Sequence, residues 1–375
     1  AQGGSGRLGD VVPEKVSIAA HHYQRPEIVA RAGLVGDSYK LAVESARTDA
    51  EFIVLCGVRF MAESAAILAR AGQTVVIPDM NAGCPMADMI DRETAESAVE
   101  ELSARLGRAV VPIAYMNSSA DVKALAGRLG GSVCTSGNAR KVLAHYLDLG
   151  LPVFFLPDFN LGMNVSRALG VSQECIRRVT RELSVARVDF PEGDAGNRDR
   201  AGRPGEDSDL SRAKVFLWDG FCHVHRAFTV SDVHAARKAC PDAVVIVHPE
   251  CASEVTALAD RSGSTEEMSR ALRDAKAGSS WVIGTEGRFV ERMAATYPNL
   301  TIAPLRASYC HNMNRIDGPA LDKALADIAS HCAARGDRQG GARIPGMVTV
   351  PPGEREDAAR ALRAMVSITE SGGVR

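Results

Sequence analysis

The chain has 375 residues, of which 46% are hydrophobic and 24% are charged, and its formal net charge is −2. This composition is that of an ordinary globular protein with room for two or three domains. The near-neutral charge argues against nucleic acid as a partner, and no run of about 18 apolar residues predicts a membrane span. The sequence shows no recognisable signal peptide, so we expect a cytoplasmic protein.

Strands and helices alternate in residues 1–106, which we expect to form a first α/β domain. Each strand is a short apolar run, and each is followed by a turn and an amphipathic stretch. The expected elements are strands at 16–24, 52–56 and 74–79, and helices at 60–71 and from about Pro26.

The same alternation returns in residues 107–188 and again in 211–315. We therefore predict an α/β fold of three similar small three-layer α/β/α domains with parallel sheets, in a pseudo-threefold arrangement around a central active site. The strands expected here are 110–117, 132–136, 152–158, 215–225, 243–250, 281–286 and 300–304, and the helices are 120–129, 139–149, 231–239 and 252–261.

Two segments differ from this pattern. Residues 189–210 are rich in Gly, Asp, Arg and Pro and almost without apolar side chains, which predicts a flexible insertion between the second and third domains. The C-terminal segment 316–375 includes an amphipathic stretch at 354–365, and we expect it to pack back on the first domain.

Polar and reactive side chains gather where the predicted strands end. The carboxyl ends of parallel strands line the ligand crevice of α/β sheets, so these positions are candidates for a shared site. They are His21, Tyr23, Cys84, Tyr115, Asn117, Ser136, Cys222, His223, His248, Glu250 and Cys310.

Nine cysteines are scattered along the chain without close pairs, a pattern that argues against a disulfide framework. Cys84, Cys222 and Cys310 stand in loops at or just after strand ends, whereas most of the others lie inside apolar strands or helical patterns. Three thiolates suit either a zinc ion or a [4Fe–4S] cluster with one open iron. Zinc sites usually contain a close cysteine pair, which this chain lacks, but spacing alone does not decide between the two.

Many short motifs in order resemble the quinolinate synthase family over nearly the whole chain. The motifs that carry this resemblance are Ala20–Gln24 (AHHYQ), Pro78–Cys84 (PDMNAGC), Tyr115–Asn117 (YMN), Cys134–Ser136 (CTS), Cys222–His225 (CHVH), His248–Cys251 (HPEC), Gly263–Thr265 (GST), Gly284–Glu286 (GTE) and Cys310 with Met313.

This resemblance implies a [4Fe–4S] cluster held by Cys84, Cys222 and Cys310, with an open iron that acts as a Lewis acid. It also implies the condensation of iminoaspartate with dihydroxyacetone phosphate, which yields quinolinate, phosphate and water for NAD biosynthesis. L-aspartate oxidase, which makes iminoaspartate, is then the expected functional partner.

The resemblance also implies roles for the strand-end residues. The catalytic candidates are Glu250, His248, Tyr23, His21 and Tyr115, since the reaction needs several proton transfers. Substrate binding is expected from His21, Ser38, Tyr115, Asn117, Ser136, His223, His248, Glu250, Ser264 and Thr265, because hydroxyls and helix N-termini suit phosphate and carboxylate groups.

Two positions depart from the family pattern: Gly137 stands where a serine is common, and Asn314 where a lysine is common. Three other functions stay open on the sequence alone. They are another Fe–S hydro-lyase, a zinc-dependent lyase or hydrolase, and a redox sensor that uses its scattered thiols.

Overall fold

The computed structural model describes residues 15–188, 210–336 and 343–371. The chain divides into two compact units: unit 1 is Ala1–Gly83 with Cys310–Val350, and unit 2 is Cys84–Tyr309 with Pro351–Arg375. Apart from Leu210, the predicted insertion at 189–210 lies outside the described residues. Within those residues, no helix combines the length and apolar composition that crossing a membrane requires.

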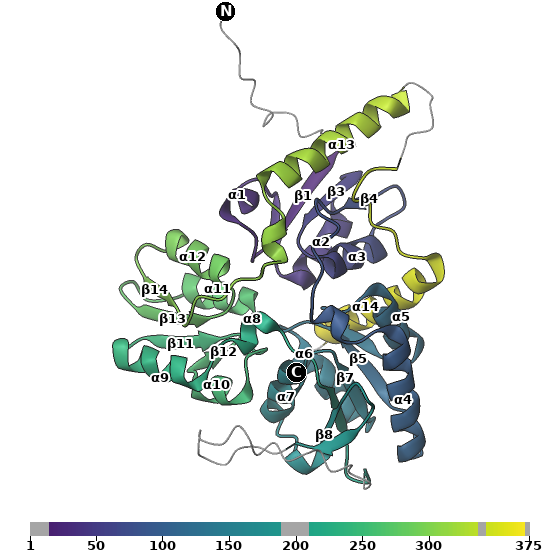
Figure 1. Ribbon diagram of the computed structural model, residues 1–375, viewed down its shortest axis with the longest axis vertical. Helices are drawn as coiled ribbons and strands as arrows, with labels where there is room; N and C mark the ends of the chain where they lie inside the picture. Colours follow the sequence, from purple (N-terminus) through teal and green to yellow (C-terminus); the bar gives the residue numbers. More distant parts are fainter. Residues whose placement is uncertain (1–14, 189–209, 337–342, 372–375) are drawn as a thin grey trace, which may run out of the picture. The chain divides into compact units, whose positions relative to one another are not determined.

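Unit 1 contains a parallel four-stranded sheet in the order β2-β1-β3-β4 (Figure 1). β3 is buried along its whole length, as expected of a central strand that helices cover on both faces. The elements of this unit are β1 (Val16–His21), α1 (Pro26–Val29), β2 (Leu34–Gly36), α2 (Ser38–Arg47), β3 (Phe52–Cys56), α3 (Arg59–Leu68), β4 (Thr74–Val76) and α13 (Gly318–Gly336).

Unit 2 contains two sheets. The larger has six strands in the order β6-β5-β7-β10-β8-β9, all parallel except for the β8–β9 pair. Its elements are α4 (Arg92–Leu106), β5 (Val111–Tyr115), α5 (Ala120–Arg128), β6 (Ser132–Cys134), α6 (Ala139–Asp148), β7 (Val153–Leu156), α7 (Phe159–Ala168), β8 (Ile176–Val179), β9 (Val185–Arg187), β10 (Val215–Trp218) and α14 (Pro352–Ser371).

The smaller sheet of unit 2 has four parallel strands in the order β12-β11-β13-β14. Helices α9 and α10 lie on one face, and α11 and α12 lie on the other (Figure 1). Its elements are α8 (His223–Arg226), α9 (Val230–Ala239), β11 (Val244–Val247), α10 (Ser253–Leu258), β12 (Arg261–Ser262), α11 (Thr265–Arg273), β13 (Ser280–Gly284), α12 (Gly287–Thr296) and β14 (Thr301–Pro304).

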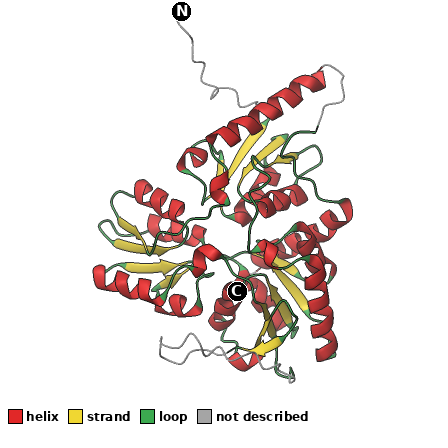
Figure 2. Cartoon of the chain, in the orientation of Figure 1, coloured by secondary structure: helices red, strands yellow, loops and turns green. Residues whose placement is uncertain are grey.

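The predicted fold class is therefore confirmed: strands form three mainly parallel sheets, and helices flank each of them (Figure 2). One strand has a different partner from the one expected. β10 was expected to open the third sheet, but it pairs with β7 and β8 in the second. All four of its side chains are buried, so the apolar run predicts a central strand without saying in which sheet.

The C-terminal segment 316–375 divides its contacts between the two units. α13 packs against α1 and β3 of unit 1, whereas α14 packs against α5, β6 and α6 of unit 2. Gly127 makes the close approach of α5 and α14 feasible, because a Cβ there would lie 1.9 Å from the carbonyl oxygen of Asp357. The domain boundaries at 106, 188 and 315, and the pseudo-threefold arrangement, stay predictions.

Candidate active site

Strands of both sheets in unit 2 end at a cluster of buried polar side chains. β5 ends at Tyr115, β11 is followed by His248 and Glu250, and β13 is followed by Thr285. His225, on the single helical turn α8, completes the cluster. All five side chains are buried, so polar partners are needed to offset the loss of water.

A continuous chain of hydrogen bonds joins four of these residues. The Tyr115 hydroxyl donates to Oε1 of Glu250, and the other carboxylate oxygen lies 2.7 Å from Nδ1 of His225. Nε2 of His225 lies 3.1 Å from Oγ1 of Thr285. Both carboxylate oxygens of Glu250 are thus held, and the residue has a fixed orientation.

His248 belongs to the same cluster through ring contact rather than through a hydrogen bond to His225. The two imidazole rings stack with centroids 4.2 Å apart and planes 14° apart. The Nδ1 atom of His248 accepts a hydrogen bond from the Glu250 backbone N–H at 3.3 Å. Because this nitrogen acts as an acceptor, the imidazole proton is placed on Nε2.

The surroundings favour a charged carboxylate and a neutral imidazole at neutral pH. Burial alone raises the pKa of Glu250, but His225, His248 and the hydrogen bonds from His225 and Tyr115 outweigh it and bring the pKa below 4.5. Burial and then the His225 ring lower the pKa of His248 to about 3, against a smaller opposing effect of Glu250. Glu250 is therefore charged at neutral pH, and its lowered pKa makes it a weaker base than an ordinary carboxylate.

Cys222 lies beside this cluster. One ligand atom each from Cys222, His225 and Glu250 lies within 4.8 Å of the others, a spacing that suits a shared metal ion. Burial raises the pKa of the Cys222 thiol well above its usual range, and Glu250 and Cys84 add to the effect. A bound cation would reverse this preference, because metal coordination deprotonates thiols. The sulfur, nitrogen and oxygen donors together fit a transition-metal site.

The loop that follows Cys84 is tied to the loop that precedes Cys222. The Trp218 indole N–H donates to the Met89 carbonyl at 3.2 Å, and the Phe221 N–H contacts the Met89 sulfur at 3.3 Å. Gly220 permits a close backbone approach within the chain, because a Cβ there would lie 2.4 Å from the Pro157 carbonyl oxygen. Two of the three predicted cysteines are thus carried by adjoining loops.

Asp158 supports Cys222 from the other side. Its fully buried carboxylate accepts hydrogen bonds from the Leu161 N–H at 2.6 Å and from the Cys222 N–H at 3.2 Å. The side chain therefore caps α7 and fixes the Cys222 backbone at the same time. Burial and then the charge of Glu250 raise the pKa of Asp158 well above its usual range.

Unit 1 holds four of the predicted site residues: His21, Tyr23, Ser38 and Cys310. His21 ends β1, and its Nδ1 accepts the Tyr23 N–H at 3.2 Å, while the two rings pack edge to face with centroids 4.7 Å apart. Ser38 is the first residue of α2, after the N-cap Asp37.

The loop that carries Cys310 is bonded both to the residues after β1 and to the segment that leads to Cys84. The Gln24 amide donates to the Met313 carbonyl at 3.0 Å, next to the end of β1. The Asn312 amide donates to the Gly83 carbonyl at 2.8 Å, and Arg315 forms an ion pair with Asp79 at 2.9 Å. These bonds all lie within unit 1, and Gly83 is the residue directly before Cys84.

The remaining predicted residues lie in the turns of unit 2. Ser136 is half-buried before α6, and Ser264 caps α11 through a reciprocal pair of bonds with Glu267. A Cβ on Gly137 would lie 3.3 Å from Oγ of Ser264, so these two turns adjoin. Thr265 begins α11, half-buried Asn117 follows β5, and His223 is exposed on α8.

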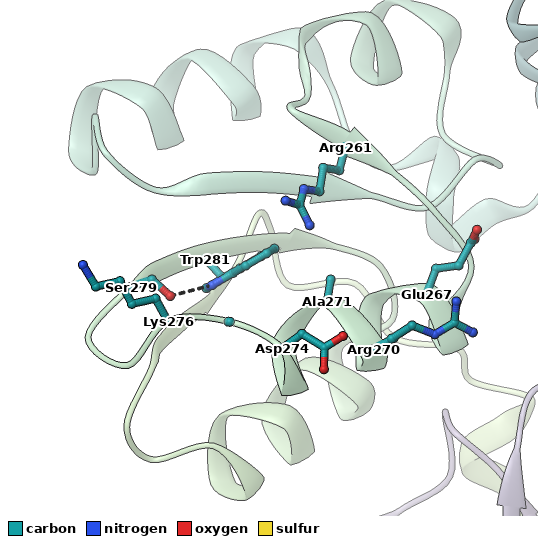
Figure 3. A pocket seen from close by; sticks show the side chains of 9 residues that line it. Arg261, Glu267, Arg270, Ala271, Asp274, Lys276, Ser279 and Trp281 are labelled. Carbon is teal, nitrogen blue, oxygen red and sulfur yellow. Dashed lines mark hydrogen bonds between the residues drawn. The ribbon is translucent and has the colours of Figure 1, made fainter.

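A separate pocket of about 510 Å³ lies beside α11. Basic and acidic side chains alternate around it, and none of the predicted site residues lines it (Figure 3). Glu267 lines this pocket and also accepts the Ser264 N–H at 2.6 Å. We assign no function to it.

Sequence reasoning did not select three residues of this site: His225, Thr285 and Asp158. The signal for His225 was present, because residues three apart share a face of a helical turn and His225 follows Cys222 by three. Asp158 and Thr285 each follow a strand, and nothing in the neighbouring sequence distinguishes them from other polar residues at strand ends. Their partners are distant in sequence, at Cys222 and His225, and no local pattern reveals such pairs.

Comparison with known proteins adds a family likeness to this geometry. Residues 11–367 match the family described as Quinolinate synthetase A protein. The chain is 38% identical to the quinolinate synthase of Bacillus subtilis over 358 residues, which covers 95% of this chain and 89% of that one. It is 42% identical to the quinolinate synthase of Streptomyces coelicolor over 331 residues, with 86% and 78% covered.

Proposed function

Because the chain belongs to the quinolinate synthase family, we propose that it condenses iminoaspartate with dihydroxyacetone phosphate to give quinolinate, phosphate and water. The observation that carries this proposal is the buried Tyr115–Glu250–His225 cluster beside Cys222. A carboxylate that is held, charged and close to a metal-binding thiol suits a reaction with several proton transfers.

The same premise assigns a [4Fe–4S] cluster to Cys84, Cys222 and Cys310. Such a cluster would supply Lewis-acid chemistry at the iron that no cysteine occupies. Support comes from the loops: Met89 ties the loop after Cys84 to the loop before Cys222. The loop of Cys310 is bonded to the carbonyl of Gly83, which precedes Cys84 in the chain.

The proton transfers of the reaction are assigned to side chains of the protein. Glu250 is assigned as the main acid/base group, since hydrogen bonds orient both of its oxygens beside Cys222. Tyr115 and neutral His248 are placed beside it to donate and exchange protons with a bound substrate. We assign His21 and Tyr23 of unit 1 to the part of the product that comes from the triose.

Anionic groups of the two substrates need a different set of residues. Ser38, Ser264 and Thr265 stand at or directly before the starts of helices, and Ser136 lies three residues before α6. Hydroxyls, backbone N–H groups and helix dipoles at such positions favour phosphate and carboxylate. Asn117, which follows β5, and His223, on α8, are assigned to contacts with hydroxyl and carboxylate groups of the substrates. L-aspartate oxidase is the expected source of iminoaspartate, in the cytoplasm.

Zinc-dependent lyase activity is the second candidate, since the Cys222, His225 and Glu250 donors alone also suit a catalytic zinc ion. Purification without oxygen separates the two. About four irons and four sulfides per chain, together with quinolinate from the two substrates, support the synthase. One zinc per chain favours the second candidate, and a chain with its full cluster that forms no quinolinate would exclude the proposed reaction.

A further inference from the structure

The turn that carries Ser136 is held by the side chain of Asn138. Oδ1 of Asn138 accepts the Thr135 N–H at 2.6 Å, and the Asn138 N–H donates back to the Thr135 carbonyl at 3.1 Å. The turn is therefore closed twice around Ser136 and Gly137. Asn138 itself is buried, so its remaining donor needs a partner.

That partner belongs to the C-terminal helix. Nδ2 of Asn138 donates to Oγ1 of Thr369 at 3.1 Å, and Oγ1 in turn donates to the Met365 carbonyl at 2.7 Å. Although Asn138 is the N-cap of α6, its side chain makes no bond to that helix, because both of its polar atoms are used elsewhere. An asparagine at this position ordinarily caps its own helix.

Helix α14, which carries Thr369, is itself packed against other elements of unit 2. It packs along α5, where Gly127 allows the two backbones to approach closely, and it also contacts β6, the strand that leads into the Ser136 turn. Thr369 lies two residues beyond the end of the family match at residue 367. The contact therefore includes a residue outside the part of the chain that matches the family.

The position of the turn matters because the turn adjoins the start of α11. A Cβ at Gly137 would already lie 3.3 Å from Oγ of Ser264. A shift of the turn by a few tenths of an ångström changes the spacing between Ser136 and Ser264, two of the four hydroxyls assigned to anionic groups of the substrates.

We propose that Thr369 is a positioning residue: through Asn138 it sets the Ser136 turn against Ser264 and so tunes the affinity for an anionic group of a substrate. The proposal rests on the proposed function for the identity of that substrate, but the structural coupling from Thr369 to the turn does not depend on it. Loss of one hydrogen bond of this kind weakens an interaction by about three- to tenfold.

The experiment compares Thr369→Val, which removes the hydroxyl at nearly constant shape, with Thr369→Ser, which retains it. Glu370→Gln, at the exposed neighbouring position, is the matched control. In the anaerobic holoenzyme we expect Thr369→Val to raise KM for one of the two substrates about three- to tenfold, with kcat within about twofold of the parent. Thr369→Ser and Glu370→Gln should retain the parent values.

Hydrogen–deuterium exchange of the 135–139 backbone gives a readout independent of turnover. We expect faster exchange in Thr369→Val and unchanged exchange in the serine variant and the control. An unchanged KM together with unchanged exchange would overturn the proposal. So would a fall in kcat that Thr369→Ser does not rescue. If the parent enzyme makes no quinolinate, the proposed function fails, while the exchange comparison still tests the coupling.

Discussion

Tyr115 donates a hydrogen bond to Oε1 of Glu250, although 135 residues separate the two in the chain. β5 of one sheet and the segment after β11 of another thus meet at a single carboxylate. With His225 on the second oxygen, Glu250 is held in one orientation, and the carboxylate keeps its charge despite its burial.

Replacement of Glu250 by glutamine should collapse turnover. The amide has nearly the same shape but cannot take up a proton, so we expect kcat to fall by about 10²–10⁴-fold. Iron content should stay at the parent value, since none of the proposed cysteine ligands is altered. Steady-state quinolinate formation and iron analysis on the same preparation check both expectations.

Glu254→Gln is the matched control, because Glu254 is an exposed glutamate on α10 a few residues along the chain. It should leave both measurements unchanged. Near-normal turnover in Glu250→Gln would remove this residue from the mechanism, whatever the iron content.

Alanine in place of Cys84, Cys222 or Cys310 should abolish the iron–sulfur cluster. Each proposed ligand is one of three, and loss of a thiolate leaves a second iron without protein coordination. We expect iron and sulfide to fall to near zero per chain after anaerobic purification, with loss of the cluster's visible absorption.

Cys56→Ala and Cys175→Ala serve as controls for this series. Cys56 is buried inside β3, where burial raises the pKa of its thiol to about 12, and Cys175 precedes β8. Both should keep full iron. A Cys222→Ala protein with its full iron complement would refute the ligand assignment.

The alternation of strands and helices was predictable because it depends on local apolar patterns. β5 and β11 appear where apolar runs end in a polar turn, and Tyr115 and Glu250 were selected for their places at those ends. The partners of β10 were not predictable, because pairing between strands depends on contacts distant in the chain.

In the site, too, motifs were visible in the sequence, whereas contacts between residues far apart in the chain were not. The Cys-His-Val-His motif indicated a functional turn, but only the structure distinguishes exposed His223 from buried His225, which contacts Glu250. The role predicted for His223 stays a prediction. The pairing of Asn138 with Thr369 spans 231 residues and has no local signature at either end.

Asp260 should stabilise the third sheet in a pH-dependent way. Both of its oxygens pair with the Arg237 guanidinium at 2.8 Å, and one also accepts the Val245 N–H at 2.7 Å. The bond from Arg237, more than any other contact, lowers the pKa of Asp260 below its usual 3.8. A lowered folded-state pKa stabilises above about pH 4, and this contribution is lost as the pH falls through the folded value.

Asp260→Asn should therefore cost about 0.5–1 kcal/mol at pH 7, a small value because the pair is partly exposed. The difference from the parent protein should narrow below pH 4. Thermal unfolding at pH 7 and pH 3 measures it, with exposed Asp242→Asn as the control. A difference of the same size at both pH values would contradict the assignment.

The contact between α5 and α14 should fail if Gly127 gains a side chain. A Cβ at this position would lie 1.9 Å from the Asp357 carbonyl oxygen and 3.1 Å from the Ala361 nitrogen, and backbone atoms have no rotamer with which to move away. Gly127→Ala must therefore displace α14, and we expect a loss of about 1–3 kcal/mol in stability.

Gly353→Ala is the matched control, because it lies in the first turn of α14 and no atom lies within 4 Å of its Cβ, so the same methyl group is added without a clash. Because Thr369 lies on the displaced helix, Gly127→Ala should also speed hydrogen exchange at residues 135–139, whereas Gly353→Ala should not. Equal stability in the two variants would show that α14 does not depend on the close approach at Gly127.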